Sequence, residues 1–166
     1  MPSSRQHRVL FRIREFRAED LGTLAEIDAQ CFPPGIAYGR KELTHYIRRP
    51  DALTLVAEST SPDLSPIAGF LVAHKVLRKS RQSIGHIVTI DVLPEARRSG
   101  LGSQLMGEAE QRLRGAGCEA VFLEVAVNNL AALQFYKRRG YFVLKTLPRY
   151  YQDELDALLM LKPLEP

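Results

Sequence analysis

The sequence lacks the features on which several classes of protein depend. It has no tryptophan and only two cysteines among 166 residues. Cys31 and Cys118 are too few for a disulfide framework and too far apart for a C-x-x-C zinc motif. The best candidates for a membrane span, 67–73 and 155–161, have the length of strands, whereas a membrane helix needs about 20 apolar residues. The N-terminal part contains no apolar signal-peptide core, so we expect a cytoplasmic protein without a membrane span.

Metal ligands and strong charge are also missing. The four histidines show no ligand spacing such as H-E-x-x-H, so we expect no metal site. The net charge of +4 favours an anionic partner without requiring one. A composition that is 45% hydrophobic and 25% charged is typical of a folded globular chain, which excludes a disordered or collagen-like protein. At this length we expect one domain over residues 1–166, with residues 1–7 as a polar, frayed tail.

Hydrophobic periodicity and turn residues predict the elements along the chain. Apolar β-type runs predict strands at 9–13, 53–57, 67–76, 83–92, 120–127, 141–144 and 155–161. Amphipathic spacing predicts a helix that starts at an Asp20 N-cap, a second helix near 40–48, a third from about 100 to 114, and a fourth from Asn128 or Asn129 to 139. The order β-α-α-β-β-β-α-β-α-β-β predicts a mixed α/β fold with helices on both faces of the sheet.

The turn at 91–103 has the chemistry of a phosphate site. A strand ends there, the basic glycine-bearing run R-R-S-G-L-G follows at 97–102, and a helix begins. Unpaired N–H groups and a partial positive charge at a helix N-terminus attract anions, and glycine lets the backbone approach them closely. The Walker pattern is absent, and Leu105 stands where the third glycine of G-x-G-x-x-G belongs. An ordinary turn with exposed arginines remains the alternative.

The run at 97–102 matches [RQ]-x-x-G-x-[GA], and the chain over 9–162 resembles the GNAT superfamily of acyl-CoA N-acyltransferases. The resemblance implies a mostly antiparallel twisted sheet of six or seven strands and acetyl-CoA as cosubstrate. It implies that the strand residues Ile90, Asp91 and Val92 pair with the pantetheine arm. The pyrophosphate would then lie on the turn formed by Arg97, Arg98, Ser99, Gly100, Leu101 and Gly102.

The segment L-E-V-A-V-N-N-L-A-A-L-Q-F-Y at 123–136 resembles a narrower group, the ribosomal-protein alanine and protein Nα-acetyltransferases. By position, Glu124 takes the role of general base, Tyr136 that of general acid and a further cofactor contact, and Asn129 that of a cofactor-contacting amide. The residues themselves are consistent with this, because Glu124 is the only charge in an apolar strand. Asn129 and Tyr136 are two helical turns apart and share one face. A solvated Glu124 and a core Tyr136 are the alternatives.

We therefore expect direct acetyl transfer to a primary amine. Glu124 would take the amine proton through water, the backbone N–H of Val92 would stabilise the oxyanion, and Tyr136 would protonate the sulfur. No covalent enzyme intermediate is needed, and Cys31 and Cys118 are interpreted as core residues.

The acceptor is less well defined. An α-amino group has a pKa of about 8 and a lysine of about 10.4, so an N-terminus is the easier acceptor at neutral pH. The F-P loop with Phe32, Pro33 and Tyr38, and the pair Tyr150 and Tyr151, resemble the peptide entry of Nα-acetyltransferases. The tryptophan that usually follows Phe-Pro in the alanine-specific enzymes is missing here.

Other readings stay open. His86 could assist as a base, although a structural strand histidine is the favoured interpretation. A small-molecule amine such as a polyamine, amino acid or antibiotic is the nearest alternative acceptor. RNA or ribosome binding through the basic clusters at 78–81, 97–98 and 137–139 is more remote, and we expect no direct nucleic-acid contact. The sequence does not distinguish a monomer from a homodimer.

Overall fold

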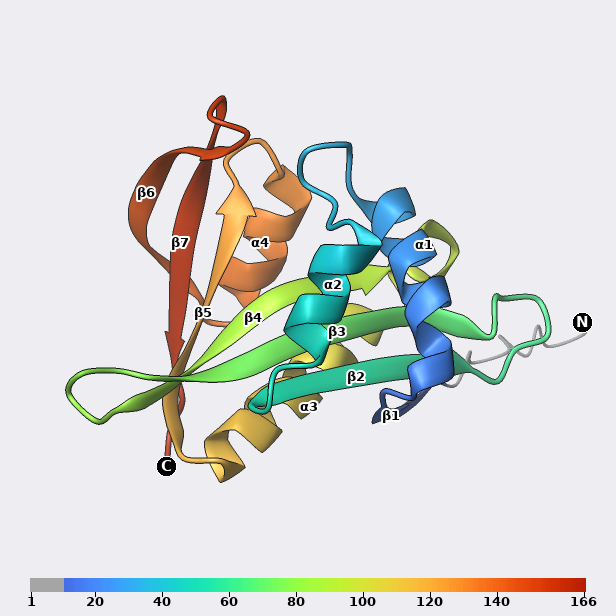
Figure 1. Ribbon diagram of the computed structural model, residues 1–166, viewed down its shortest axis with the longest axis horizontal. Helices are drawn as coiled ribbons and strands as arrows, with labels where there is room; N and C mark the ends of the chain where they lie inside the picture. Colours follow the sequence, from blue (N-terminus) through green and yellow to red (C-terminus); the bar gives the residue numbers. More distant parts are fainter. Residues whose placement is uncertain (1–10) are drawn as a thin grey trace, which may run out of the picture.

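The structure, a computed structural model, describes residues 11–166 (Figure 1). The expected tail at 1–7 and the expected strand start at Val9 lie outside the described residues. The strands are β1 Phe11–Glu15, β2 Ala52–Ser59, β3 Ile67–Leu77, β4 Ser83–Val92, β5 Cys118–Ala126, β6 Phe142–Tyr151 and β7 Leu155–Pro163. The helices are α1 Leu21–Cys31, α2 Arg40–Ile47, α3 Leu101–Gly115 and α4 Leu130–Arg138, with two single-turn 3-10 helices, η1 Ala18–Asp20 and η2 Pro94–Ala96.

The order of the helices and strands is the predicted one, but β6 is longer than the strand expected at 141–144. It continues through Pro148 to Tyr151, with a register shift between Leu147 and Tyr151. β6 is an edge strand, where the missing N–H of proline interrupts no ladder on the outer side.

The seven strands form one sheet in the order β1-β2-β3-β4-β5-β7-β6, and only β4 and β5 are parallel. Helices α1 and α2 cover one face, while α3 and α4 cover the other (Figure 1). This confirms the expected mixed, mostly antiparallel sheet with helices on both faces. Within residues 11–166, no helix is long and apolar enough to cross a membrane.

Two apolar cores, one on each face, explain the sequence pattern of the central strands. Side chains alternate between the faces of a strand, so a strand covered on both faces is apolar throughout. Leu71 of β3 packs in the core beneath α3, whereas its neighbour Val72 packs beneath α1 and α2. The amphipathic helix expected from about 100 to 114 is α3, and its apolar residues, which recur every four positions, are all buried: Leu101, Leu105, Ala109 and Leu113.

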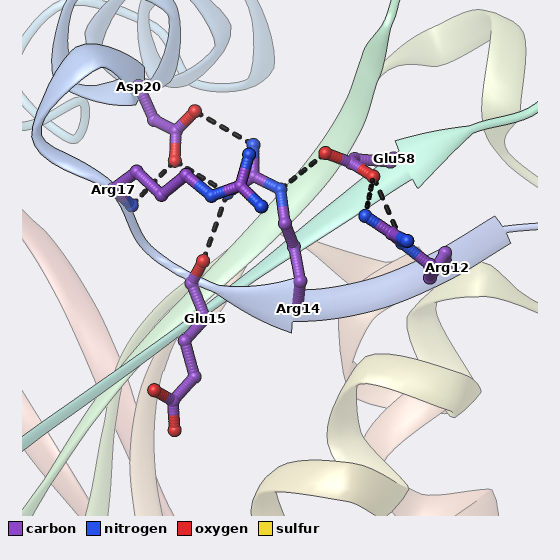
Figure 2. Close-up of polar contacts among 6 residues, drawn as sticks. All are labelled: Arg12, Arg14, Glu15, Arg17, Asp20 and Glu58. Carbon is purple, nitrogen blue, oxygen red and sulfur yellow. Dashed lines mark hydrogen bonds and ion pairs between the residues drawn. The ribbon is translucent and has the colours of Figure 1, made fainter.

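An ion-pair network joins β1 to the start of α1 (Figure 2). Arg14 donates from both terminal nitrogens to Asp20, at 2.8 and 2.9 Å, and its Nε also contacts Glu58 of β2. Asp20 accepts a further bond from the backbone N–H of Arg17, at 2.7 Å. The hydrogen bonds from Arg14 lower the pKa of Asp20.

Asp20 was expected to cap α1, and this expectation is wrong for its side chain. Asp20 does occupy the N-cap position, but its carboxylate makes no cap hydrogen bond with the helix. A bidentate, charge-assisted pair with an arginine is stronger than a neutral cap bond, so the carboxylate turns toward Arg14 instead.

Strands β4 and β5 pair only along the first half of β4 and then diverge (Figure 1). The paired residues are Ser83 with Cys118, Gly85 with Val121 and His86 with Phe122. Beyond His86, β4 stays bonded to β3 as far as Val92, while β5 stays bonded to β7. The facing edges of these two strands are therefore open to a ligand.

A buried pair of acids fastens α1 to β4. Asp28 and Asp91 are both essentially unexposed, and the two carboxyl groups interact closely with each other. Asp28 accepts from the backbone N–H of Tyr38 at 2.5 Å, and Asp91 accepts from the hydroxyl of Thr89 at 2.6 Å. Burial, together with the charge of Asp28, raises the pKa of Asp91 well above its usual range, so the pair shares a proton.

This shared proton makes stability depend on pH. A carboxyl whose pKa is raised by folding stabilises the fold fully at acidic pH, below its unfolded pKa, and loses that contribution as pH rises through the folded pKa. In Asp91→Asn, the amide donates permanently to Asp28. We expect the variant to gain stability relative to the wild type as pH rises from 4 to 8, by about 1–3 kcal/mol. Urea denaturation across this range measures the difference.

Asp63→Asn is the matched control, because Asp63 is exposed. Its stability should follow that of the wild type at every pH. Parallel curves for Asp91→Asn and the wild type would contradict the shared proton.

Candidate active site

A cavity of about 1240 Å³ occupies the space between the diverging strands β4 and β5. It is closed by the start of α3, by α4, by the loop between α1 and α2, and by the turn between β6 and β7. This volume exceeds that of a typical small-ligand pocket, which is about 300–1000 Å³. The predicted site residues that line it are Phe32, Pro33, Tyr38, Ile90, Val92, Arg97, Arg98, Gly100, Leu101, Gly102, Glu124, Asn129, Tyr136 and Tyr151.

Three predicted site residues do not line the cavity. The side chain of Asp91 is buried against Asp28, away from the cavity. The hydroxyl of Ser99 donates to the carbonyl of Ala96 and braces the turn. Tyr150 is 47% exposed and rests edge-on against Tyr151, with ring centroids 4.9 Å apart.

The turn before α3 has the backbone geometry that its sequence predicts for anion binding. Gly100 is the N-cap of α3 with φ +85°, and no side chain caps this helix end. A valine would be strained at that φ, so glycine is required there. Arg98 is also left-handed, with φ +59°. Arg97 donates from Nε to the carbonyl of Val92 at 3.0 Å and so ties the turn to the end of β4.

Glu124 lies on β5, lines the cavity and is paired with His86 of β4. Its Oε2 is 2.7 Å from Nε2 of His86, and both side chains are mostly buried. The ring of His86 stacks on Phe122, with centroids 4.4 Å apart and planes 3° apart. Glu124 is therefore held by a defined partner, and the reading of His86 as a purely structural histidine did not anticipate this contact.

A second histidine extends this contact away from the cavity. Nε2 of His74, on β3, lies 3.1 Å from Nδ1 of His86, and His74 is buried. Sequence reasoning assigned His74 no role. The signal that could have found it is the pairing of β3 with β4, which sets His74 directly opposite His86.

Tyr136 and Asn129 reach the cavity from α4. Tyr136 is 8% exposed, and burial together with the negative charge of Asp91 raises its pKa, so its hydroxyl is a proton donor at neutral pH. Asn129 caps α4, as expected, by accepting from the N–H of Ala132 at 3.2 Å. With Oδ1 used by this cap, the NH₂ group of Asn129 is what remains for a ligand.

The far end of the cavity is bounded by two loops that touch. Gly35, with φ +93°, lies against Gln152 of the β6–β7 turn, and a Cβ on Gly35 would come within 2.5 Å of the Gln152 side chain. The loop carries Phe32 and Pro33, and the turn follows Tyr151. The loop and the turn, which are in close contact, therefore bound this end of the cavity together.

The expectation that Cys31 is a core residue is wrong, because Cys31 lines the cavity and is only partly buried. Its thiol donates to the carbonyl of Val92 at 3.4 Å, and burial raises its pKa to about 11. A protonated thiol is a poor nucleophile, so Cys31 does not serve as one. Cys118 is buried, as expected.

Charge is distributed unevenly along the cavity. Three arginines line it on the side of α3 and α4: Arg97, Arg98 and Arg138. Two carboxylates line it elsewhere, Glu124 on β5 and Glu154 in the β6–β7 turn. The part of the cavity that carries the arginines suits a polyanion, and the parts that carry the carboxylates suit a cation. Within residues 11–166, no group of three or more His, Cys, Asp or Glu side chains is arranged to hold a metal ion.

Comparisons with known proteins agree with this arrangement. Residues 21–141 match the Acetyltransferase (GNAT) family. An uncharacterised N-acetyltransferase of Methanocaldococcus jannaschii is 34% identical over 154 residues, which is 90% of each chain. An N-alpha-acetyltransferase of Sulfurisphaera tokodaii is 30% identical over 160 residues, or 93% of each chain.

The fold also matches that of solved enzymes. The crystal structure of Arabidopsis thaliana NAA60 in complex with acetyl-CoA superimposes with a TM-score of 0.83 at 23% identity, covering 93% of this chain and 99% of that one. The sequence match, the fold and the cavity together lead to one conclusion: the chain belongs to the GNAT family and is an N-acetyltransferase that uses acetyl-CoA.

Proposed function

We propose that the protein is an Nα-acetyltransferase, which transfers the acetyl group of acetyl-CoA to the N-terminal amine of a protein, such as a ribosomal protein. The observation that carries the proposal is that Glu124 and Tyr136 line one cavity between the diverging strands. The likeness to a relative named N-alpha-acetyltransferase along nearly the whole chain supports it.

Each residue has a role that follows from its chemistry. Glu124 takes the proton of the acceptor amine, directly or through one water, and the amine then forms its bond to the acetyl carbon. The N–H of Val92 donates to the oxygen on which negative charge develops. As the bond from carbon to sulfur breaks, the Tyr136 hydroxyl gives its proton to the sulfur. Acetyl-CoA supplies the activated acetyl group, and the turn at 97–102 binds its pyrophosphate.

Two arguments favour an N-terminal amine as the acceptor: the pKa of the amine and the residues that line the cavity. At neutral pH about a tenth of N-terminal amines are already neutral, against under about a thousandth of lysines. A single carboxylate base is therefore sufficient for an N-terminus. The carboxylates of Glu124 and Glu154 attract a cationic chain end, and the loop and turn that meet at Gly35 and Gln152 would contact the chain that follows it.

The phosphate turn is tested at Gly100. A valine there is strained at the left-handed φ and brings methyl groups toward the exposed amides of α3. We expect Gly100→Val to weaken CoA binding at least about tenfold in a calorimetric titration. The matched control is Gly115→Val at the other end of α3, where a Cβ meets no atom within 4 Å. An unchanged CoA titration in Gly100→Val would contradict the proposed turn.

The base is tested by Glu124→Gln. The amide keeps the shape of the side chain and can still meet His86, but it cannot accept the amine proton. We expect kcat to fall by about 10²–10⁴-fold while the affinity for acetyl-CoA stays nearly constant. Glu119→Gln, at an exposed position of the same strand, should keep the wild-type rate. A fully active Glu124→Gln would remove Glu124 as the base.

The acceptor class is tested with an array of peptides that differ in their first residue. Acetyl-CoA is the acetyl donor, and free polyamines are added as competing acceptors. We expect acetylation of free N-termini, loss of signal on peptides with blocked N-termini, and little inhibition by polyamines. Strong acetylation of the polyamines, with silent peptides, would establish a small-molecule enzyme instead.

A further inference from the structure

Three side chains on three adjacent strands form one hydrogen-bonded series that begins at the cavity. Glu124 on β5 meets His86 on β4 at 2.7 Å, and His86 meets His74 on β3 at 3.1 Å. We propose that His74 is a positioning residue: its Nε2–H fixes the tautomer of His86, which then holds the Glu124 carboxylate ready for the amine proton. The inference rests on the role of Glu124 proposed above.

The tautomers follow from counting donors. An ionised carboxylate only accepts, so Nε2 of His86 carries the proton in its bond to Glu124. A neutral His86 then has a bare Nδ1, and the contact at 3.1 Å needs a donor from Nε2 of His74. A neutral His74 has one ring proton, and that proton is on Nε2. Nδ1 of His74 therefore carries no proton.

The surroundings of His74 agree with this count. Its Nδ1 is buried and has no hydrogen-bond partner among the described residues. The nearest charged atom is Oδ2 of Asp51 at 3.8 Å, beyond hydrogen-bond distance. An unprotonated Nδ1 is acceptable at this position, whereas a protonated Nδ1 would be a buried donor without an acceptor.

The other groups facing His74 keep it neutral. Arg49, which pairs with Asp51 at 3.3 Å, and the ring of Tyr46, stacked at 6.5 Å, lie beside it on the side of α2. Burial lowers the pKa of His74, and the proximity of His86 and Arg49 lowers it further, against smaller opposing effects of Asp51 and of the Lys75 backbone. His74 is therefore a neutral donor at the pH where the enzyme works.

This arrangement opposes protonation of His86 at Nδ1. A proton there would force His74 to give up its Nε2 proton and carry one on Nδ1, where no acceptor lies within hydrogen-bond distance. Without the donor from His74, no N–H would oppose a proton on Nδ1 of His86, and a doubly protonated His86 would be a cation beside Glu124. A carboxylate paired with a cation is a weaker base, so activity would fail sooner as pH decreases.

Two substitutions at His74 separate the hydrogen bond from the packing. His74→Phe keeps a flat ring beside Tyr46 but removes the donor, whereas the amide of His74→Gln can donate from a similar position. For His74→Phe we expect kcat to fall about tenfold, KM for acetyl-CoA to stay constant, and the acid limb of the kcat profile to move up by about one pH unit. His74→Gln should restore most of the rate and the wild-type profile. His45→Phe, at an exposed position on α2, is the control.

The tautomer of His86 is measured directly by NMR of the full-length protein labelled with ¹⁵N-histidine. This measurement needs no substrate and does not depend on enzyme activity. We expect His86 of the wild type to carry its proton on Nε2, and His74→Phe to lose this preference. A proton on Nδ1 in the wild type overturns this inference alone, whereas an active Glu124→Gln overturns the proposed function. Equal losses of rate in His74→Phe and His74→Gln, with an unmoved pH profile, would reduce His74 to packing and also overturn the inference.

Discussion

The divergence of β4 from β5 is the constraint on which the rest of the structure depends. Beyond His86, the two parallel strands no longer satisfy each other's backbone groups, and each keeps only its outer neighbour. A strand edge facing a cavity needs partners, and an extended ligand with amide groups can supply them. The same divergence leaves room between the strands and brings the N-terminal ends of α3 and α4 to the mouth of the gap (Figure 1). The turn at 97–102, which follows β4, and Glu124, on β5, therefore line one opening because these two strands separate.

A sheet covered on both faces also explains why so many of its polar side chains occur in pairs. A carboxyl or imidazole in such an interior is unfavourable unless another polar group meets it. Asp28 with Asp91, and His74 with His86, are both solutions of this kind. In each pair one polar group meets another that would otherwise be buried alone, and each pair connects a structural strand to a part of the cavity. The first pair anchors the loop that carries Tyr38, and the second lies next to the Glu124 carboxylate.

The sequence predicted the parts of the fold and site that depend on local spacing. The four-residue spacing of the apolar residues in α3, the glycine at its N-cap and the isolated Glu124 in the apolar part of β5 all follow from residues close together in the chain. What the sequence did not predict depends on register between strands. His74 and His86 are twelve residues apart and meet only because β3 and β4 pair at that point. Asp20 looked like a cap because local spacing cannot reveal that Arg14 reaches it from β1.

The protonation states around the cavity are consistent with the proposed role of one carboxylate, Glu124, as the base. The neighbours that could compete for a proton are already in their neutral forms: the Tyr136 phenol and the Cys31 thiol have raised pKa values, and His74 has a lowered one. The Asp28–Asp91 pair already holds its shared proton away from the ligand. A proton arriving with a cationic amine therefore meets Glu124 as the acceptor that lines the interior of the cavity, with His86 on its other oxygen. An N-terminal amine needs little help to become neutral, so one carboxylate base is sufficient for such an acceptor, whereas a lysine would require a stronger base; this is consistent with the proposed role of Glu124.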